Sequence, residues 1–291
     1  MAIKVEMLRC FCTVAQTGNL AEASDRLGRT QSAISMTLKQ LEEHLGKKLF
    51  EGERKSQLSA LGEQVFDLAQ KQLRQFDETV HSIETSASSV LGLIRVVSVP
   101  SVAAVVFPKV MHEVSQKYPG LKIELRDTDT QQVIDALIRG QADIGIASGE
   151  FALNAVQAIP LFEDGFGLVA SPDHPLVQTP GVPTIQDVVD AGFVRNNLCS
   201  LIETRELREA IEQTDFTAHN TYSLIAMVRT GRWVTVLPKT VVEFLPEELV
   251  FRPIAGLPDR RKVFLYLNER TRFRSIAEDI CELVKAQSSP S

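Results

Sequence analysis

The stretch RTQSAISMTLKQLEEHLGKKLF, residues 29–50, decides the fold of the N-terminal part of this chain. Its apolar residues recur at spacings of four, three and four, at Ile34, Leu38, Leu41 and Leu45. This spacing is the periodicity of an amphipathic α-helix, and a threonine such as Thr30 commonly caps a helix N-terminus. We therefore predict a helix that begins after Thr30 and buries one apolar stripe.

The opposite side of this helix is polar and mostly uncharged. At about 100° per residue, its side chains centre roughly 120° from the apolar stripe; they are Gln31, Ser32, Ser35, Met36 and Lys39. The first turns of a recognition helix contact base edges, where glutamine pairs with adenine and an apolar tip contacts a thymine methyl group. A solvated face usually carries Glu and Lys, as this helix does further on. Contact with double-stranded DNA is therefore one interpretation, and an ordinary solvated face is the other.

Shorter patterns surround this helix. The sequence LAEASDRL, residues 20–27, predicts a second helix that ends at Gly28, and two helices joined by such a turn match a helix-turn-helix unit. The sequence KKLFEGERKSQLS, residues 47–59, predicts a short β-hairpin or wing. We expect residues 1–58 to form an all-α winged helix-turn-helix domain.

A long helix is expected next, in a linker of residues 59–91, because no Gly or Pro occurs from Glu63 to Leu91. Its apolar positions alternate at four and three residues, at Ala69, Leu73, Phe76, Val80, Ile83 and Ala87. This heptad spacing is typical of a helix that pairs with another helix, so we predict dimerisation through Leu73, Phe76, Val80 and Ile83. The alternative is a helix that lies on the core of its own domain.

From Gly92 onward, predicted strands alternate with predicted helices, which indicates parallel βαβ units. The strands are expected at residues 93–99, 121–125, 142–147, 165–170, 233–238 and 262–268. The helices are expected at residues 103–117, 130–140, 185–191, 203–213 and 222–231 and from Ser275 onward. The two series predict a multidomain chain whose residues 92–291 form two α/β lobes, one of about residues 92–161 and 268–291 and one of about 162–267.

Hydroxyl side chains follow the first two of these strands. Ser98 and Ser101 come after the first strand, and Thr130 follows the second and begins a helix. Ligands of parallel α/β sheets bind beyond the carboxyl ends of strands, where helix N-termini and hydroxyls suit small carboxylates. These residues are therefore candidates for ligand contact, with simple helix capping as the alternative.

Composition and charge agree with a soluble globular protein of two or three units. The 291 residues are 44% hydrophobic and 23% charged, with a formal net charge of −6. Residues 26–58 nevertheless contain 7 basic and 4 acidic residues, so the acidity of the whole chain does not exclude DNA. The longest uncharged stretch, residues 96–108, contains two prolines and is shorter than the about 20 apolar residues of a membrane span. Without a secretion signal at its N-terminus, the protein is expected in the cytoplasm and not in a membrane.

The chain offers no pattern typical of an enzyme or a metal site. The four cysteines, Cys10, Cys12, Cys199 and Cys281, are too few and too scattered for a disulfide framework or a zinc site, although a redox sensor stays open. GFGLVA, residues 165–170, resembles a dinucleotide motif but runs into SPDHP instead of a helix. We expect no catalytic residue, no metal and no cofactor besides a small-molecule effector.

A resemblance appears at residues 11–50, where TQSAIS, LEEHLG and LF occur in the order and spacing of LysR-type transcriptional regulators. The segments YPGLKIEL, LIRGQADIGIA and VRTGRWVTVLP are similar to the effector-binding domain of that family. The chain departs from the family pattern at Gly52, where Arg is usual, and in a wing that is one residue shorter. The resemblance covers nearly the whole chain and implies a two-lobed, periplasmic-binding-protein-like effector domain.

Several site residues are implied by this resemblance. Gln31, Ser32, Ser35 and Met36 match base-contacting positions, Thr30, Lys39 and Arg54 match phosphate contacts, and Arg54 or Lys55 would supply the minor-groove contact of the wing. The effector would contact Ser101 and Thr130, with Asn196, Asn197, Ser200 and Tyr222 from the second lobe. The family also implies a homotetramer, as a dimer of dimers, that acts on RNA polymerase.

Two other classes of protein compete with a transcription regulator. Two α/β lobes around a cleft also occur in solute-binding proteins, but the helix-turn-helix and the missing secretion signal weigh against that class. An enzyme would need a cluster of acid, base and nucleophile, which the sequence does not suggest.

Overall fold

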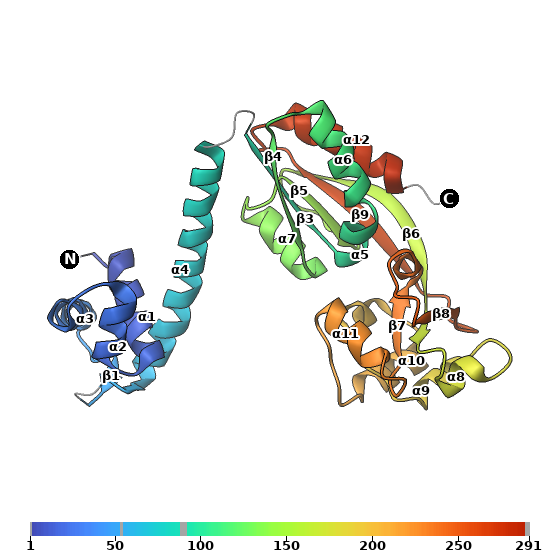
Figure 1. The fold of residues 1–291 in the computed structure, drawn as a ribbon, viewed down its shortest axis with the longest axis horizontal. Helices are drawn as coiled ribbons and strands as arrows, with labels where there is room; N and C mark the ends of the chain where they lie inside the picture. Colours follow the sequence, from blue (N-terminus) through green and yellow to red (C-terminus); the bar gives the residue numbers. More distant parts are fainter. Residues whose placement is uncertain (1, 53–54, 88–91, 289–291) are drawn as a thin grey trace. The chain divides into compact units, whose positions relative to one another are not determined.

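A computed structural model describes residues 2–52, 55–87 and 92–288 of the chain. The chain divides into two compact units, Met1–Ser88 and Ser89–Ser291 (Figure 1). Each unit has its own hydrophobic core, and the helix-turn-helix and the α/β half predicted from the sequence fall into separate units.

The N-terminal unit contains α1 (Val5–Thr17), α2 (Leu20–Leu27), α3 (Gln31–Leu45), β1 (Phe50–Glu51), β2 (Gln57–Leu58) and α4 (Ala60–Ala87). Its core includes Phe11 and Ile34, both 0% exposed, which join α1 to the apolar stripe of α3. The side chain of Thr30 accepts a hydrogen bond from the Ala33 N–H, so it caps α3 as predicted. Gly28 ends α2 in the left-handed conformation with φ 61°, which glycine adopts without steric cost. The predicted helix-turn-helix is confirmed.

The wing is held to α3 by a buried carboxylate. β1 and β2 pair antiparallel, with Phe50 opposite Leu58, which confirms the predicted hairpin. Glu42 is 5% exposed and accepts a hydrogen bond of 2.9 Å from the Leu49 N–H, just before β1. The Lys48 and Lys55 ammonium groups lie 3.1 and 3.6 Å from the same carboxylate. Arg54, a predicted DNA contact, lies outside the described residues.

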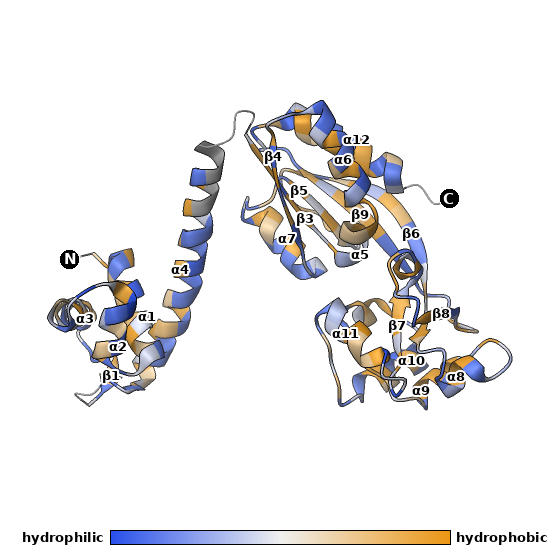
Figure 2. Ribbon diagram, in the orientation of Figure 1, coloured by the Kyte–Doolittle hydropathy of each residue, from blue (hydrophilic) through white to orange (hydrophobic). Residues whose placement is uncertain are grey.

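Helix α4 divides its apolar stripe between two uses. Hydrophobic bands recur along the helix (Figure 2). Ala69 and Leu73 pack into the core of the N-terminal unit, as do Leu61, Val65 and Phe66 before them. Arg9 of α1 forms an ion pair of 2.5 Å with Asp77 of α4. Phe76 and Ile83 are 39% and 63% exposed. Leu73 was predicted to take part in dimerisation, but it is only 9% exposed and packs on the core of its own domain, which was the alternative. We therefore no longer count it as a dimerisation residue.

The first lobe of the C-terminal unit is a sheet covered by helices (Figure 1). Its elements are β3 (Leu93–Ser98), α5 (Pro100–Val105), α6 (Phe107–Lys117), β4 (Lys122–Asp127), α7 (Thr130–Ile138), β5 (Ile144–Ser148) and α12 (Arg274–Ser288). β3 pairs in parallel with β4 and β5, as predicted. The helix expected at residues 103–117 is two helices, α5 and α6, because Pro108 lacks the N–H needed to continue α5 and instead suits the first turn of α6.

Two long strands run from the first lobe into the second. β6 (Val156–Ala170) and β9 (Arg260–Asn268) pair antiparallel over most of their length, and β9 also pairs antiparallel with β5. The expected lobe boundary at residue 268 is therefore corrected, because β9 belongs to the sheet of the first lobe. The expectation of parallel units throughout is also corrected, because all pairings of β6 and β9 are antiparallel.

The second lobe is built on the end of β6. Phe166–Ala170 of β6 lies between β7 (Thr235–Pro238) and β8 (Val250–Pro253). The helices of this lobe are α8 (Pro175–Gln178), α9 (Ile185–Val189), η1 (Asn197–Leu201), α10 (Arg205–Glu212), α11 (Thr221–Val228) and η2 (Lys239–Glu243). GFGLVA lies inside β6, which excludes a dinucleotide loop there.

The buried Glu42 gives a prediction about the wing. Burial by itself raises the pKa of Glu42, but the Leu49 N–H and the two lysines outweigh it and lower the pKa below its ordinary value. A lowered pKa stabilises the folded state above the ordinary glutamate pKa of about 4.3, and this stabilisation is lost as the pH falls through the folded-state pKa. Glu42→Gln should therefore lower the opening free energy of residues 41–51 by about 1–2 kcal/mol at pH 7, measured by hydrogen exchange.

The control for this prediction is Glu43→Gln. Glu43 is the neighbouring glutamate and is exposed, and among the described residues its carboxylate pairs with Lys39 alone, at 3.8 Å, so its replacement should leave exchange unchanged. The deficit of the Glu42 variant should shrink as the pH falls below the ordinary glutamate pKa of about 4.3 and through the lowered folded-state pKa, because the wild-type carboxylate then becomes protonated as well. Equal protection of both variants at pH 7 would contradict the role of Glu42.

Candidate DNA-contact helix and ligand cavity

Helix α3 presents two chemically different sides. Ile34 and Leu38 are 0% and 2% exposed and face the core of the unit. The four base-contact candidates are all exposed: Gln31, Ser32, Ser35 and Met36. Met36 is 61% exposed, which is unusual for an apolar side chain without a partner. The structure therefore brings the four predicted residues together on one accessible face.

The residues predicted to contact phosphate differ in their availability. Thr30 is exposed but already caps α3, and its hydroxyl lies 3.1 Å from that of Ser32. Lys39 is exposed, and its one ion pair in the described part of the chain, at 3.8 Å to Glu43, is a surface pair weak enough to yield to a phosphate. Lys55 is 17% exposed in its side chain, pairs with Glu42 and lies over the Phe50 ring. The expected wing contact of Lys55 is therefore corrected, because its charge is already neutralised inside the domain.

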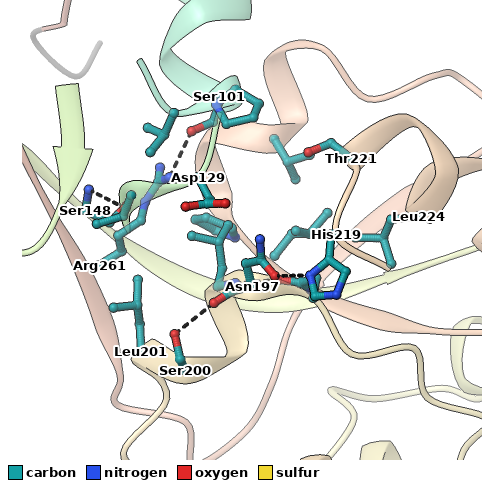
Figure 3. A pocket seen from close by; sticks show the side chains of 18 of the residues that line it. Ser101, Asp129, Ser148, Asn197, Ser200, Leu201, His219, Thr221, Leu224 and Arg261 are labelled. Atoms are coloured by element: carbon teal, nitrogen blue, oxygen red, sulfur yellow. Dashed lines mark hydrogen bonds between the residues drawn. The ribbon is translucent and has the colours of Figure 1, made fainter. Parts of the chain in front are cut away.

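A cavity of about 840 Å³ lies between the two lobes of the C-terminal unit (Figure 3). Ligand pockets commonly have volumes of 300–1,000 Å³, so this cavity has room for a small organic molecule. The first lobe lines it with residues that include Ser101, Asp129, Thr130 and Ser148. The second lobe lines it with residues that include Arg195, Asn196, Asn197, Ser200, Thr217 and His219.

The first-lobe wall is rich in hydroxyl groups. Ser101 lies in α5, and its Oγ accepts a hydrogen bond of 2.8 Å from Arg261. Thr130 begins α7, and its Oγ1 accepts a hydrogen bond of 3.1 Å from the Ser148 N–H. The carboxylate of Asp129 caps α7 by accepting a hydrogen bond from the Gln132 N–H. The sequence prediction that Ser101 and Thr130 meet at the strand ends is thus matched by their positions.

A buried guanidinium lies behind this wall. The side chain of Arg261 is 0% exposed, and its Nε and Nη2 donate hydrogen bonds of 2.9 and 2.8 Å to the two carboxylate oxygens of Asp164. Asp164 also accepts hydrogen bonds from the backbone and the hydroxyl of Thr240 in η2. Arg261 therefore connects Ser101 of the first lobe to Thr240 of the second, and Figure 3 shows Arg261 and Ser101 pointing toward each other.

The second-lobe wall contains amide and cationic groups. Asn196 is 6% exposed and its side chain is used inside the lobe, because Nδ2 donates to Thr235 and to the Val236 carbonyl. The Asn197 side chain lies 2.7 Å from His219 Nδ1, and the Ser200 hydroxyl donates to the Asn197 carbonyl (Figure 3). Asn197 and Ser200 therefore line the cavity, as the family resemblance implied. Asn196 also lines it, but its side-chain amide is engaged in hydrogen bonds within the second lobe.

Two predicted ligand contacts are corrected. Ser98 is 0% exposed and does not line the cavity. Its hydroxyl donates a hydrogen bond to the carbonyl of Val99, the residue that follows β3. Side chains alternate along a strand, so Ser98 faces away from the wall. Tyr222 is 79% exposed on α11 and also does not line the cavity, because the first turn of α11 directs Thr221 and Leu224 there instead.

The sequence reasoning missed Arg261, Asp164 and Ser148. A signal for Arg261 was present, because it precedes Val263 and Leu265 at period two and so shares the inward face of β9. Ser148 ends β5 in the way that Ser98 ends β3, so the strand-end rule applied to it as well. Asp164 carried no such signal, because its partner is distant in the sequence.

The cysteines and the metal-binding residue types form no further site in the described residues. Cys10, Cys12, Cys199 and Cys281 are all buried and unpaired. Burial raises the pKa of the Cys199 thiol to about 11, which disfavours the reactive thiolate. Among the residues that the structure describes, no group of three His, Cys, Asp or Glu could hold a metal ion, and no helix is long and apolar enough to span a membrane.

Comparison with known proteins gives the same two-part division. Residues 5–63 match the family "Bacterial regulatory helix-turn-helix protein, lysR family", and residues 87–289 match "LysR substrate binding domain". A "Probable hydrogen peroxide-inducible genes activator" of Streptomyces viridosporus is 29% identical over 81% of this chain and 78% of its own length.

Solved structures share the fold of the whole chain. The LysR family transcriptional regulator CbnR has a TM-score of 0.69 and 16% sequence identity, covering 99% of this chain and 100% of its own. Full-length CbnR in complex with its target DNA has a TM-score of 0.68 and 15% identity, covering 98% of this chain and 100% of its own. Since the two family matches together span nearly the whole chain, this protein belongs to the LysR family and is a DNA-binding transcriptional regulator with an effector-binding domain.

Proposed function

We propose that this regulator binds an operator through the exposed face of α3 and responds to a small molecule in the cavity between the lobes. The observation that carries the proposal is the cavity of about 840 Å³, which both lobes line with polar residues. A ligand that contacts both walls binds one arrangement of the lobes more tightly than another. It therefore shifts the population of lobe arrangements, and with it the geometry of the bound DNA.

In the DNA-binding unit we assign the base contacts to Gln31, Ser32, Ser35 and Met36. These side chains lie on the first turns of α3, which is the part of a recognition helix that reaches base edges in the major groove. Thr30 and Lys39 are assigned to phosphates, because they flank this face and are exposed. Arg54 of the wing remains a proposed contact.

In the effector-binding unit we assign ligand contact to Ser101, Thr130, Asn197 and Ser200, with a small carboxylate as the effector. Hydroxyl groups at the first turn of a helix favour an anion there. Arg195 lines the opposite wall, and no ion pair of its guanidinium occurs within the described residues, so it adds a positive charge to the cavity. The chain acts in this proposal as a regulator without enzymatic activity, metal or further cofactor.

For the assembly we propose pairing through the exposed part of α4, at Phe76, Val80 and Ile83. Two of these apolar side chains are substantially exposed on a single helix, which a partner helix would cover. Two such dimers would form a homotetramer that bends DNA and acts on RNA polymerase in the cytoplasm.

Thiol-based sensing of peroxide is not supported for this chain, although three relatives carry the name of a probable hydrogen peroxide-inducible genes activator. Cys199 is 3% exposed, and its pKa is raised to about 11 by burial. The other cysteine of the C-terminal unit, Cys281, lies in α12 of the first lobe. Neither feature suits a thiol that reacts and then forms a disulfide.

The first prediction concerns base contact. Gln31→Ala should weaken binding to a preferred sequence by about 1–3 kcal/mol, or roughly five- to 150-fold, because a base would lose its hydrogen-bond partner. Gel shifts on DNA selected by the wild-type protein from a random pool measure this change. Gln72→Ala, an exposed glutamine on α4, serves as control. Unchanged affinity and sequence preference in the Gln31 variant would rule out its proposed role.

The second prediction concerns pairing. Phe76→Asp should weaken dimerisation, because it places a charge on the apolar side of α4. Analytical sedimentation of the full chain over a range of concentrations measures the oligomer. The control, Gln64→Asp, adds the same charge at an exposed position on the other side of the helix. An oligomer that is equally stable in both variants would speak against pairing through Phe76.

The third prediction concerns the cavity. Replacing Ser101 and Thr130 together by alanine should abolish the rise in melting temperature caused by binding small carboxylates, while DNA affinity stays the same. Ser98→Ala is a matched control, because it removes a hydroxyl of the same lobe that does not line the cavity. Thermal shift with a panel of such acids and gel shifts of the same samples provide the two measurements. A ligand response that survives in the double variant would refute the site.

A further inference from the structure

The DNA-binding unit contains an ion pair beside the first turn of α3. Nη2 of Arg29, in the turn between α2 and α3, lies 3.0 Å from a carboxylate oxygen of Glu6, in the first turn of α1. The two side chains are 41% and 49% exposed, so both charged groups remain accessible to solvent. A solvent-exposed pair of this kind contributes little to stability and can exchange one partner for another at small cost.

The backbone of Arg29 is fixed by the turn that ends α2. Gly28 adopts the left-handed conformation, and the Arg29 N–H donates a hydrogen bond of 3.1 Å to the Ser24 carbonyl. The next residue, Thr30, caps α3. The flexible side chain of Arg29 therefore starts from a well-defined position at the end of α3 that carries Gln31 and the other base-contact candidates.

Glu6 is held beside the same end of α3. Cys10, which lies four residues further along α1, is buried, and its Sγ donates a hydrogen bond of 3.8 Å to the Ile34 carbonyl. This contact places α1 alongside the first turns of α3. The ion pair therefore lies next to the helix end that we assign to the major groove.

DNA in the proposed position brings phosphates close to this helix end. Many of the hydrogen bonds in protein–DNA interfaces go to phosphate oxygens, and they position the helix whose side chains contact the bases. A guanidinium is well suited to this role, because it can donate two parallel hydrogen bonds to a phosphate as it does to a carboxylate. Arg29 can thus exchange the carboxylate of Glu6 for a phosphate, whereas the charge of Glu6 can only repel the DNA backbone.

We propose that Arg29 is a DNA-backbone contact and that Glu6 is a positioning residue, whose carboxylate competes with a phosphate for the Arg29 guanidinium. In the free protein Glu6 neutralises Arg29 and holds it against α1. On DNA, Arg29 pairs with a phosphate and leaves Glu6 as an unpaired negative charge. The competition weakens binding to all sequences by about the same factor. The inference rests on the proposed contact of α3 with bases and adds a residue pair that sets the affinity.

The test measures binding of the full chain to two DNA duplexes by fluorescence anisotropy over a series of KCl concentrations. One duplex is selected by the wild-type protein from a random pool, and the other is a random-sequence duplex of the same length. Arg29→Met removes the charge and should weaken binding to both duplexes by roughly three- to ten-fold. The slope of log affinity against log salt should become shallower by about 0.9 for each phosphate contact that is lost.

Two further variants test the exchange of partners. Arg29→Lys keeps the positive charge and should retain most of the wild-type salt slope. Glu6→Gln frees Arg29 and should strengthen binding to both duplexes by about two- to five-fold, which is the range expected of one surface ion pair. In the double variant with Arg29→Met this gain should fall to that of the control, because Glu6 acts through Arg29.

The controls make the same charge changes on α4, where Asp67 and Arg74 are exposed. Asp67→Asn and Arg74→Met should each change the affinity by less than about two-fold, because salt screens a charge that does not touch DNA. Circular dichroism of each variant checks the fold. If Arg29→Met does not fold, the comparison of Glu6→Gln with Asp67→Asn decides alone.

The outcomes separate this inference from the proposed base contact. Wild-type affinity and salt slope in Arg29→Met would overturn the inference, and so would a Glu6→Gln variant that gains no more than Asp67→Asn. A loss confined to the selected duplex would also overturn it, because a phosphate contact acts on both duplexes. If Gln31→Ala changes nothing while Arg29→Met weakens binding to both duplexes, the proposed base contact fails and the backbone contact stands.

Discussion

The C-terminal unit depends on an ion pair at the place where the chain passes from one lobe to the other. Arg261 and Asp164 are direct cross-strand partners on β9 and β6. Their side chains are 0% and 9% exposed, so each charge would be strongly destabilising alone, and loss of one partner of such a pair costs about 3–5 kcal/mol. The pair therefore fixes the register of the two strands that connect the lobes. It also holds Ser101 on one side and Thr240 on the other.

This position limits how the lobes can move. β6 runs without interruption for 15 residues through the crossing, so a change in lobe arrangement has to twist paired strands. The register between β6 and β9 shifts between Pro160 and Phe162, close to the ion pair, and such an irregularity bends and twists a strand locally. A change in lobe arrangement would therefore bend the strands most easily near the bulge, while Arg261 and Asp164 keep the strands together. The ligand that we propose at Ser101 would contact a hydroxyl of this same network, which would connect occupancy of the cavity to the crossing.

Much of the fold follows from patterns that act over short distances. Helix periodicity, the cap at Thr30 and the ending at Gly28 predict the helix-turn-helix correctly because each depends on neighbouring residues. The prediction that residues 262–267 belong to the second lobe was wrong, because the pairing of β9 with β5 joins strands that are distant in the sequence, and the alternation of strands and helices does not reveal it. Leu73 was misplaced for a related reason, since one apolar stripe on α4 serves both its own core and the exposed end.

The ligand cavity was predictable only in its outline. The rule that ligands bind at strand ends led to Ser101 and Thr130, but it could not decide which of the neighbouring side chains faces the cavity. For this reason Ser98 and Tyr222 were predicted as ligand contacts although they do not line the cavity. Ser148 satisfies the rule and lines the cavity, but it was not predicted. Arg261 required knowledge of its partner, because an arginine is buried only where a carboxylate meets it.

The N-terminal unit applies a different principle, in which charge is kept away from the face that we propose contacts bases. The acidic Glu42 of α3 is turned inward to the wing, while Gln31, Ser32, Ser35 and Met36 stay exposed and uncharged. General attraction to DNA comes from lysine and arginine side chains that neutralise phosphates, and residues 26–58 supply 7 basic against 4 acidic residues although the whole chain has a formal net charge of −6. This attraction carries no sequence preference. Discrimination between sequences must then come from hydrogen bonds and apolar contacts at base edges, which suits an uncharged face. We propose that the exposed Lys39 beside this face contacts the DNA backbone, which would position the helix without adding sequence preference.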